Sequence, residues 1–261
     1  MNFVERYGPW ALVTGASAGI GAEFARQLAA RGLHLVLLAR RKDKLEELAL
    51  ELRQKHRIEV RVLAADLARA DFADEVGAAL AAQEIGLLVN NAGFGITGEF
   101  LRHDLERESD LLAVNCRALM ILTHRLGPPM AQRKRGGIIF VSSVLAFLAT
   151  PYSAHYAASK VYELSLAQGL RYELGRYGVD VLALCPGSTD TEFHDVAGSR
   201  AVGAMAVEPV VRQGLAGLGR RSVVIPGWRN RLLVGLLKFA PRALSTTFAG
   251  QAMRRLGRVQ K

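Results

Sequence analysis

Cysteine is scarce in this chain, which has 261 residues and only Cys116 and Cys185, far apart in the sequence. This excludes a disulfide-stabilised secreted scaffold, and we expect both thiols to be small buried residues rather than ligands. No apolar run reaches about eighteen residues, so no membrane-spanning helix is expected. The first residues lack the apolar core of a signal peptide, and the sequence therefore predicts a cytoplasmic protein.

Acidic residues are absent from the last part of the chain. From Arg220 to the end there are ten Arg or Lys residues and no Asp or Glu, whereas the preceding 219 residues carry 24 of each sign. The net charge of +10 therefore belongs to the tail and not to the body. Such a tail suits an anionic membrane surface or another polyanion, and a solvated basic segment explains it equally well. We expect no nucleic-acid partner.

Short apolar runs alternate with helical patterns over most of the chain. This alternation predicts an α/β fold: a doubly wound, Rossmann-like parallel sheet of about seven strands with helices on both faces. Residues 1–227 are expected to form the domain, and 228–261 a basic, amphipathic helical extension. The expected strands are 10–14, 34–38, 58–63, 87–90, 138–141, 179–184 and 223–225, and long helices are expected over 19–32, 104–132 and 154–177.

A further helix is predicted after the second strand. Asp43 and Glu46 have the spacing of a capping box, which marks a helix start. Leu45, Leu48 and Leu52 follow at helical spacing and predict the buried stripe of that helix.

A glycine-rich turn follows the first predicted strand. Gly15, Gly19 and Gly21 lie between that strand and the next helix. Glycine lets the backbone approach a pyrophosphate, and the helix N-terminus offers free N–H groups to it. Because the glycines stand between a strand and a helix, a dinucleotide site is a better interpretation than a plain tight turn.

The end of the second strand carries no acidic residue. Ala39 stands there, followed by Arg40 and Arg41. An acidic residue at this point would bind the ribose 2′-hydroxyl and repel a 2′-phosphate, whereas a guanidinium suits a phosphate by charge and geometry. The sequence therefore predicts NADP(H) as the cofactor.

Tyr156 and Lys160 are four residues apart and would share one face of a helix. A phenol ordinarily has a pKa near ~10, and a neighbouring ammonium lowers it, which suits the pair for proton transfer. Ser142 and Ser143 follow a predicted strand upstream of the pair. None of the six His residues has a metal-like spacing, so no metal site is expected.

These motifs, in this order and at these spacings, resemble the short-chain dehydrogenase/reductase family over about residues 8–225. The resemblance implies an oxidoreductase that interconverts a ketone and a secondary alcohol by hydride transfer. It also implies four catalytic residues. They are Tyr156 as proton donor, Ser143 as partner of the carbonyl oxygen, Lys160 as the group that binds the nicotinamide ribose and lowers the Tyr pKa, and Asn115 as holder of a relay water.

The resemblance further implies the nucleotide-binding residues. Asp66 matches the position that contacts adenine, and the turn from Pro186 to Thr191 matches the one that meets the nicotinamide. Asn90 and Ser142 are expected to be structural. The full predicted set is Gly15, Ser17, Gly19, Ile20, Gly21, Arg40, Arg41, Asp66, Leu67, Asn91, Gly93, Tyr156, Lys160, Pro186, Gly187, Thr189 and Thr191.

The substrate is expected to be a small-molecule carbonyl or alcohol. Residues 145–148 and Phe193 suggest an apolar pocket, and Phe193 falls in the stretch that forms a lid in the family. Residues 7–13 and 38–48 are similar to the branch with 17β-hydroxysteroid dehydrogenases and long-chain 3-ketoacyl reductases, which implies a hydrophobic ketone. The resemblance also implies a homodimer or homotetramer formed through the two long helices.

The extension begins with an amphipathic pattern. Its apolar face comprises Leu232, Leu233, Leu236, Leu237 and Ala240, and Arg231 and Lys238 lie opposite. We expect that face to be buried, as a substrate lid or a subunit contact rather than as a peripheral membrane contact, with all three roles left open.

A non-catalytic dinucleotide sensor or a membrane-surface scaffold on the same fold is the competing interpretation. The complete set of four catalytic residues favours the enzyme, because a protein that had lost its activity would be expected to lose some of them.

Overall fold

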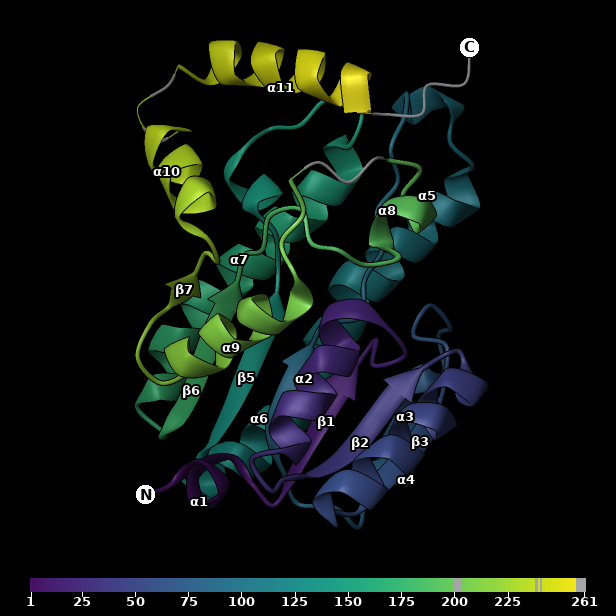
Figure 1. The fold of residues 1–261 in the computed structure, drawn as a ribbon, viewed down its shortest axis with the longest axis vertical. Coiled ribbons are helices and arrows are strands. Elements are labelled where there is room, and N and C mark those ends of the chain that lie inside the picture. Colours follow the sequence, from purple (N-terminus) through teal and green to yellow (C-terminus); the bar gives the residue numbers. More distant parts are fainter. Residues whose placement is uncertain (200–202, 238, 240, 257–261) are drawn as a thin grey trace.

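Seven parallel strands form one twisted sheet in the order β3-β2-β1-β4-β5-β6-β7, which confirms the predicted fold (Figure 1). The computed structural model describes residues 1–199, 203–237, 239 and 241–256. The strands are β1 (Trp10–Thr14), β2 (His34–Ala39), β3 (Val60–Ala64), β4 (Ile85–Asn90), β5 (Gly136–Val141), β6 (Val179–Leu184) and β7 (Val223–Val224).

The central strands are continuous apolar runs because helices cover both faces of the sheet. Every residue of β1, β4 and β5 is buried. One face is covered by α2 (Gly19–Ala29), α3 (Lys42–His56) and α9 (Val207–Gly217). The other face is covered by α4 (Phe72–Leu80), α6 (Leu119–Gln132) and α7 (Ala154–Gly175).

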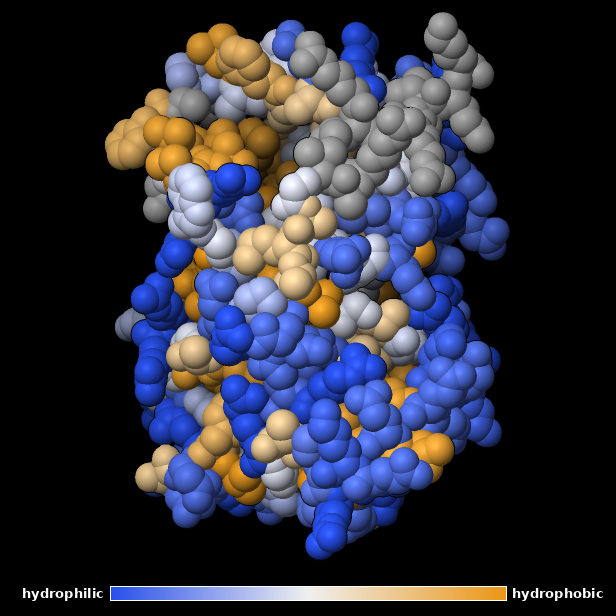
Figure 2. Space-filling model, in the orientation of Figure 1, coloured by the Kyte–Doolittle hydropathy of each residue, from blue (hydrophilic) through white to orange (hydrophobic). Residues whose placement is uncertain are grey.

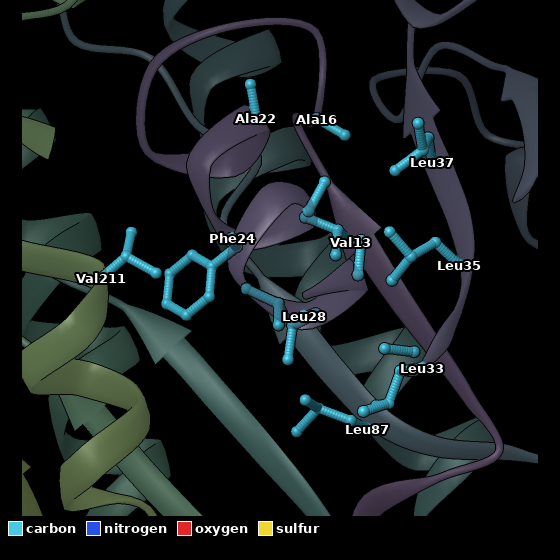
Figure 3. Packing of buried hydrophobic residues seen from close by; sticks show 14 of the residues in the cluster. Val13, Ala16, Ala22, Phe24, Leu28, Leu33, Leu35, Leu37, Leu87 and Val211 are labelled. Atoms are coloured by element: carbon cyan, nitrogen blue, oxygen red, sulfur yellow. The ribbon is translucent and has the colours of Figure 1, made fainter. Parts of the chain in front are cut away.

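Packing on the first face centres on α2. Its fully buried Phe24 points toward Val211 of α9, and its Leu28 lies over the sheet (Figure 3). Val13 of β1 and Leu35 of β2 belong to the same cluster on the sheet side, so the helix that follows the glycine turn is fixed against two strands.

The predicted helix over 104–132 is divided. A regular helix, α5 (Leu105–Leu112), leads into a π-helical turn at Ala113–Ala118, and α6 continues from Leu119. Such turns widen a helix locally and often occur at functional sites. Asn115 lies within this one.

The predicted capping box is wrong. Helix α3 begins at Lys42, with Arg41 as its N-cap and no side-chain cap bond, so Asp43 already lies within the first turn. The buried stripe of Leu45, Leu48 and Leu52 is confirmed. The α-helices that the sequence interpretation omitted include α1 (Phe3–Tyr7), α4, α8 (Phe193–Val196) and α9.

Two C-terminal helices, α10 (Trp228–Leu237) and α11 (Arg242–Leu256), lie beyond the carboxyl ends of the strands (Figure 1). The predicted extension is therefore helical, but its orientation differs from the prediction. Leu232, Leu233 and Leu236 are exposed, and Val234 is the buried residue of α10. Ala240 and Lys238 lie outside the described residues.

The orientation of α10 is set by its first turn. The amide of Asn230 donates to the carbonyl oxygen of Pro226 at 2.8 Å, and the same side chain lies against Gly187, where an added Cβ would be 2.6 Å from it. This turns the Asn230 and Val234 side of α10 toward the body. Within the described ranges, no helix is both long and apolar enough to cross a membrane.

The register of α3 can be tested with two leucines on the same helix. Leu52→Ala should lower the free energy of unfolding by about 2–5 kcal/mol, because the side chain is fully buried and its removal leaves a cavity. Leu50 is 55% exposed, and Leu50→Ala should change that free energy by less than about 0.5 kcal/mol. Urea denaturation followed by circular dichroism measures both, and equal losses would contradict this packing.

Candidate active site

A cleft of about 750 Å³ lies at the carboxyl edge of the sheet. Loops from both halves of the sheet line it, and between β1 and β4 the strand order changes direction. Ligands of open α/β sheets bind at such a point. The cleft therefore has the position expected of a dinucleotide site.

Nearly all the predicted site residues line this cleft; the exceptions are Gly21 and Asn115. Gly21 lies just behind the wall, where an added Cβ would be 2.2 Å from the carbonyl oxygen of Gly15. Asn115 is fully buried beneath Gly93, whose added Cβ would be 3.0 Å from the Asn115 Oδ1. Gly21 and Asn115 therefore contact residues that line the cleft without lining it themselves.

The glycine turn forms a cradle that side chains would fill. Gly15 and Gly19 have φ of +65° and +55°, the left-handed region that favours glycine. An added Cβ at Gly15 would lie 2.8 Å from the Asn91 amide nitrogen. The N-cap of α2, Ala18, makes no side-chain cap bond, which leaves N–H groups of the first turn for a ligand. This cradle fits a pyrophosphate.

Asn91 fastens the cradle to the neighbouring strand. Its Nδ2 donates to the carbonyl oxygens of Thr14 and Gly15 at 2.9 and 3.2 Å. Its backbone N–H donates to the Thr14 hydroxyl at 3.0 Å. Asn90 points to the other side of the sheet and donates to Thr123 of α6 at 3.0 Å. Asn91 thus lines the cleft and also holds its shape.

Two guanidinium groups stand at the end of β2. Arg41 donates to the Ser17 hydroxyl of the glycine turn at 3.1 Å and pairs with Glu192 at 2.9 Å. Arg40 lies 3.9 Å from Asp66 across the same rim. Both pairs are solvent-exposed, and exposed pairs contribute little to stability, so the guanidiniums can exchange these partners for another anion.

Tyr156 and Lys160 project from the first two turns of α7, and both are almost fully buried. The Lys160 Nζ lies 5.6 Å from the centre of the tyrosine ring. It donates to the carbonyl oxygen of Val141 at 3.0 Å and to the Glu163 Oε1 at 2.7 Å. The Ser142 hydroxyl donates to the backbone oxygen of Lys160 at 2.8 Å, which fixes α7 against the end of β5.

The pKa of Tyr156 does not move in the predicted direction. Burial raises it, the Lys160 ammonium lowers it, Glu163 raises it, and a hydrogen bond with Ser143 lowers it, with a net increase above 10. Burial alone would lower the pKa of Lys160, but Glu163 and Tyr156 outweigh it and the net direction is upward. At neutral pH the site thus contains a neutral phenol beside an ammonium.

The Asn115 side chain is fully engaged in local contacts. Its Nδ2 donates to the carbonyl oxygen of Phe94 and to the Ser159 hydroxyl, both at 3.0 Å, and its Oδ1 accepts from the Phe94 N–H at 3.1 Å. These bonds tie the π-helical turn to α7 and to the loop after β4. They hold Gly93 against Lys160, whose Nζ lies 3.4 Å from the position of an added Gly93 Cβ.

Apolar residues surround the phenol. The Tyr156 ring lies 5.4 Å from that of Phe193 on α8 (Phe193–Val196), and Leu145 belongs to the same cluster. Leu145 and Phe193 line the cleft as the sequence suggested, whereas Ala146 and Phe147 pack into the core. The Thr191 methyl group, just before α8 in the sequence, packs against Gly19. A Cβ added at Gly19 would lie 2.8 Å from that methyl carbon.

Among the residues that the sequence interpretation did not assign to this site are Met253 and Glu163. Met253 of α11 lines the cleft, and nothing in the tail sequence indicates this. Glu163 contacts Lys160 from three positions further along α7, a spacing that the sequence did show. No group of three or more His, Cys, Asp or Glu side chains within the described residues could hold a metal ion.

Comparison with known proteins places this site in a family. The family model for short chain dehydrogenase matches residues 9–200. A 7beta-hydroxysteroid dehydrogenase from Clostridium sardiniense is 34% identical over 235 residues, 88% of this chain and 90% of that protein. A very-long-chain 3-oxoacyl-CoA reductase from Pyricularia oryzae is 39% identical over 67% of this chain, which spans about half of the fungal protein (54%).

Among solved structures, a short-chain dehydrogenase from Sphingobium yanoikuyae in complex with NADPH has a TM-score of 0.83 and 34% identity, covering 97% of this chain and 98% of its own. Relatives named inactive hydroxysteroid dehydrogenase-like protein 1 also match, the human one at 32% identity over 71% of this chain and 57% of its own. The chain belongs to the short-chain dehydrogenase family. It is thereby a dinucleotide-binding oxidoreductase by family, similar to the hydroxysteroid dehydrogenase and ketoacyl reductase branch.

Proposed function

We propose that this protein is an NADP(H)-dependent oxidoreductase that interconverts a bulky hydrophobic ketone and its secondary alcohol. One observation carries the proposal. Ser143, Tyr156 and Lys160 line the same cleft as the glycine cradle and the two guanidiniums, and Asn115 lies directly behind it. Proton-transfer groups and a nucleotide cradle in one cavity are what such a reaction requires.

Some residues of the cleft would bind the cofactor, and others would transfer the proton. The glycine turn and the uncapped start of α2 would hold the pyrophosphate, and the bound nicotinamide would supply or accept the hydride. Tyr156, kept neutral by its raised pKa, would donate a proton to the carbonyl oxygen during reduction. Ser143 would donate a hydrogen bond to the same oxygen, and Lys160 would place a positive charge beside the phenol.

The residues at the end of β2 support a preference for NADP(H). Ala39 leaves the 2′-position without a carboxylate, and Arg40 and Arg41 offer guanidiniums whose present partners are exposed. The similar Sphingobium dehydrogenase was solved with NADPH. A 2′-phosphate would receive charge-assisted hydrogen bonds at this rim.

The substrate end of the cleft supports a bulky apolar ketone. Phe193 and Leu145 enclose Tyr156, and Met253 of α11 adds an apolar side chain to the wall. Relatives at similar identity are named for a steroid and for a very long acyl chain. A steroid nucleus and a very long acyl chain are both large hydrocarbon groups.

The extension acts in this proposal as a lid over the substrate end. Ala249 is buried, and an added Cβ at Gly250 would lie 3.3 Å from Pro151, in the loop before the catalytic helix. Arg254 donates a hydrogen bond to the Tyr152 hydroxyl in the same loop. The inner face of α11 therefore rests on the body beside the cleft.

The outer face of the extension supports contact with an anionic lipid surface. Figure 2 shows apolar side chains gathered over α10 and the start of α11. The exposed apolar residues are Trp228, Leu232, Leu233, Leu236, Phe239, Leu244 and Phe248. Arg229 lies on the same part of α10, and the tail sequence contains no acidic residue to repel anionic headgroups.

Exposed apolar residues on the two long helical stretches support a homodimer or homotetramer. They are Leu112, Met120, Val161 and Tyr162. Pairing of these helices between copies of the chain would cover them.

The competing non-catalytic role has support from relatives named inactive. The four proposed catalytic residues are nevertheless all present in this chain.

Removing the phenolic hydroxyl tests the proposed chemistry. Tyr156→Phe should keep the fold and nucleotide affinity nearly intact and lower turnover of a ketone by at least about a hundredfold, since it removes the proton donor. Steady-state rates of NADPH oxidation measure this, with nucleotide binding followed by fluorescence. Tyr162→Phe, a partly exposed tyrosine on the same helix, is the matched control. Wild-type turnover in Tyr156→Phe would rule out the assignment.

Cofactor choice can be reversed at the end of β2. Ala39→Asp combined with Arg40→Ser should move the preference from NADPH toward NADH, because a phosphate contact is lost and a 2′-hydroxyl acceptor is gained. The lost charge-assisted contact is worth roughly 1.5–3 kcal/mol, or about tenfold to a hundredfold in affinity. Titration of both proteins with both nucleotides decides this. Tighter binding of NADH than NADPH by the wild type would refute it.

The outer face of the tail can be tested separately from catalysis. Leu232→Ser with Leu236→Ser should reduce co-sedimentation with phosphatidylcholine–phosphatidylserine vesicles by about fivefold or more, since two exposed leucines no longer insert. Rates on a water-soluble ketone should stay unchanged. Leu50→Ser, an exposed leucine on α3, is the control. If the wild type does not sediment with these vesicles, the lipid contact is wrong.

A further inference from the structure

Glu163 is a buried carboxylate beside Lys160 that takes no direct part in the proposed proton transfer. It lies on α7 three residues after Lys160, and only 1% of its surface is exposed. Its Oε1 accepts a hydrogen bond from the Lys160 Nζ at 2.7 Å. Its Oε2 is buried and has no hydrogen-bond partner among the described residues. Burying a carboxylate costs free energy, so we ask what its contact with Lys160 contributes.

The contact with Glu163 limits the directions in which the Lys160 ammonium can donate hydrogen bonds. An ammonium has three N–H donors. Val141 and Glu163 accept from two of them, and both acceptors are buried. One donor remains for the cleft that Lys160 lines. Glu163 therefore helps to decide which direction that last N–H takes.

The ionisable groups around Glu163 change their charge well above neutral pH. Burial raises the pKa of the Cys116 thiol, in the π-helical turn, to about 11. Burial likewise raises the pKa of Cys185, which follows β6, to about 12. Tyr156 and Lys160 have pKa values raised above their ordinary 10 and 10.5. None of these four titrates near neutrality.

Glu163 does titrate there. Burial raises its pKa from 4.5 to about 7, and the Lys160 ammonium limits the increase. In the neutral range, its carboxyl is thus the member of this cluster whose charge varies. A negative Glu163 raises the pKa of Tyr156, in opposition to Lys160.

We propose that Glu163 is a positioning residue that acts through Lys160: it orients the ammonium, and its negative charge opposes the electrostatic pull of Lys160 on the Tyr156 phenol. This inference rests on the proposed function of Tyr156 in proton transfer. An ionised Glu163 favours the protonated phenol, the form that donates a proton during ketone reduction. A neutral Glu163 leaves Lys160 unopposed and favours the phenolate, the form that accepts a proton during alcohol oxidation.

Removing the charge of Glu163 should allow alcohol oxidation at lower pH. Oxidation requires the phenolate, so its rate rises with pH through the pKa of Tyr156. Glu163→Gln keeps the shape of the side chain and an oxygen that accepts from Lys160, but removes the charge. The pKa of Tyr156 should then fall, and the rising limb of kcat/KM against pH should move to lower pH by about one unit.

Two readouts test the inference with Glu163→Gln. The first is the pH profile of kcat/KM for alcohol oxidation. The second needs no turnover: absorbance titration of Tyr156 in the protein without nucleotide, taken as the difference from Tyr156→Phe. Both should shift to lower pH by about one unit. Glu173→Gln, the same substitution at an exposed position of α7, should shift neither.

The outcomes separate this inference from the proposed function. If the wild type turns over an alcohol but Glu163→Gln matches it in both readouts, the inference is overturned and the proposed function stands. If the wild type turns over no substrate, the proposed function fails, and the absorbance titration alone decides whether Glu163 acts on Tyr156. Should Glu163→Gln not fold, Glu163→Ala must shift the titration in the same direction, and an unshifted titration overturns the inference.

Discussion

Hydrogen bonds between Thr14 and Asn91 hold the two halves of this molecule at the distance its cleft requires. The Thr14 hydroxyl donates to the carbonyl oxygen of Val89 and accepts from the N–H groups of Asn91 and Ala92. The Asn91 amide returns two bonds to the glycine turn. The turn after β1 is thereby fixed beside the segment after β4, at the point where the strand order changes direction.

This close approach leaves no room for side chains in the turn. An added Cβ at Gly15 or Gly21 would lie less than 3 Å from Asn91, so glycine is required for the attachment as well as for a ligand. With the turn fixed, α2 starts at the floor of the cleft. The same edge of the sheet receives Ser143, which follows β5, and the first two turns of α7, where Lys160 is buried. A buried ammonium needs partners, and Val141 and Glu163 supply them.

Much of this arrangement could be predicted from the sequence because its causes are local. Apolar runs such as His34–Ala39 indicate strands buried on both faces, and the spacing of Tyr156 and Lys160 follows from helix geometry. Glycines between a strand and a helix require a close approach of the backbone. All the predicted site residues except Gly21 and Asn115 therefore line one cleft, and which of them touch a nucleotide stays a prediction.

The remainder depends on tertiary contacts that the sequence does not show. The apolar pattern of α10 suggested a buried leucine face, but the contact of Asn230 with Gly187 turns Val234 inward instead. Glu163 was not assigned to the site from the sequence, and its negative charge raises the Tyr156 pKa because the fold buries both side chains beside Lys160. The bonds of Asn115 exist because a π-helical turn brings it against Phe94 and Ser159.

We propose that this cleft transfers hydride between NADPH and a ketone. Hydride transfer can be followed by incubating the purified protein with NADPH deuterated at the transferable position and a panel of bulky ketones, with mass spectrometry of the products. We expect a secondary alcohol with one deuterium on the carbinol carbon, formed by the wild type and not by Tyr156→Phe. Binding of NADPH without any deuterated alcohol from the whole panel would contradict it and favour a non-catalytic nucleotide-binding protein.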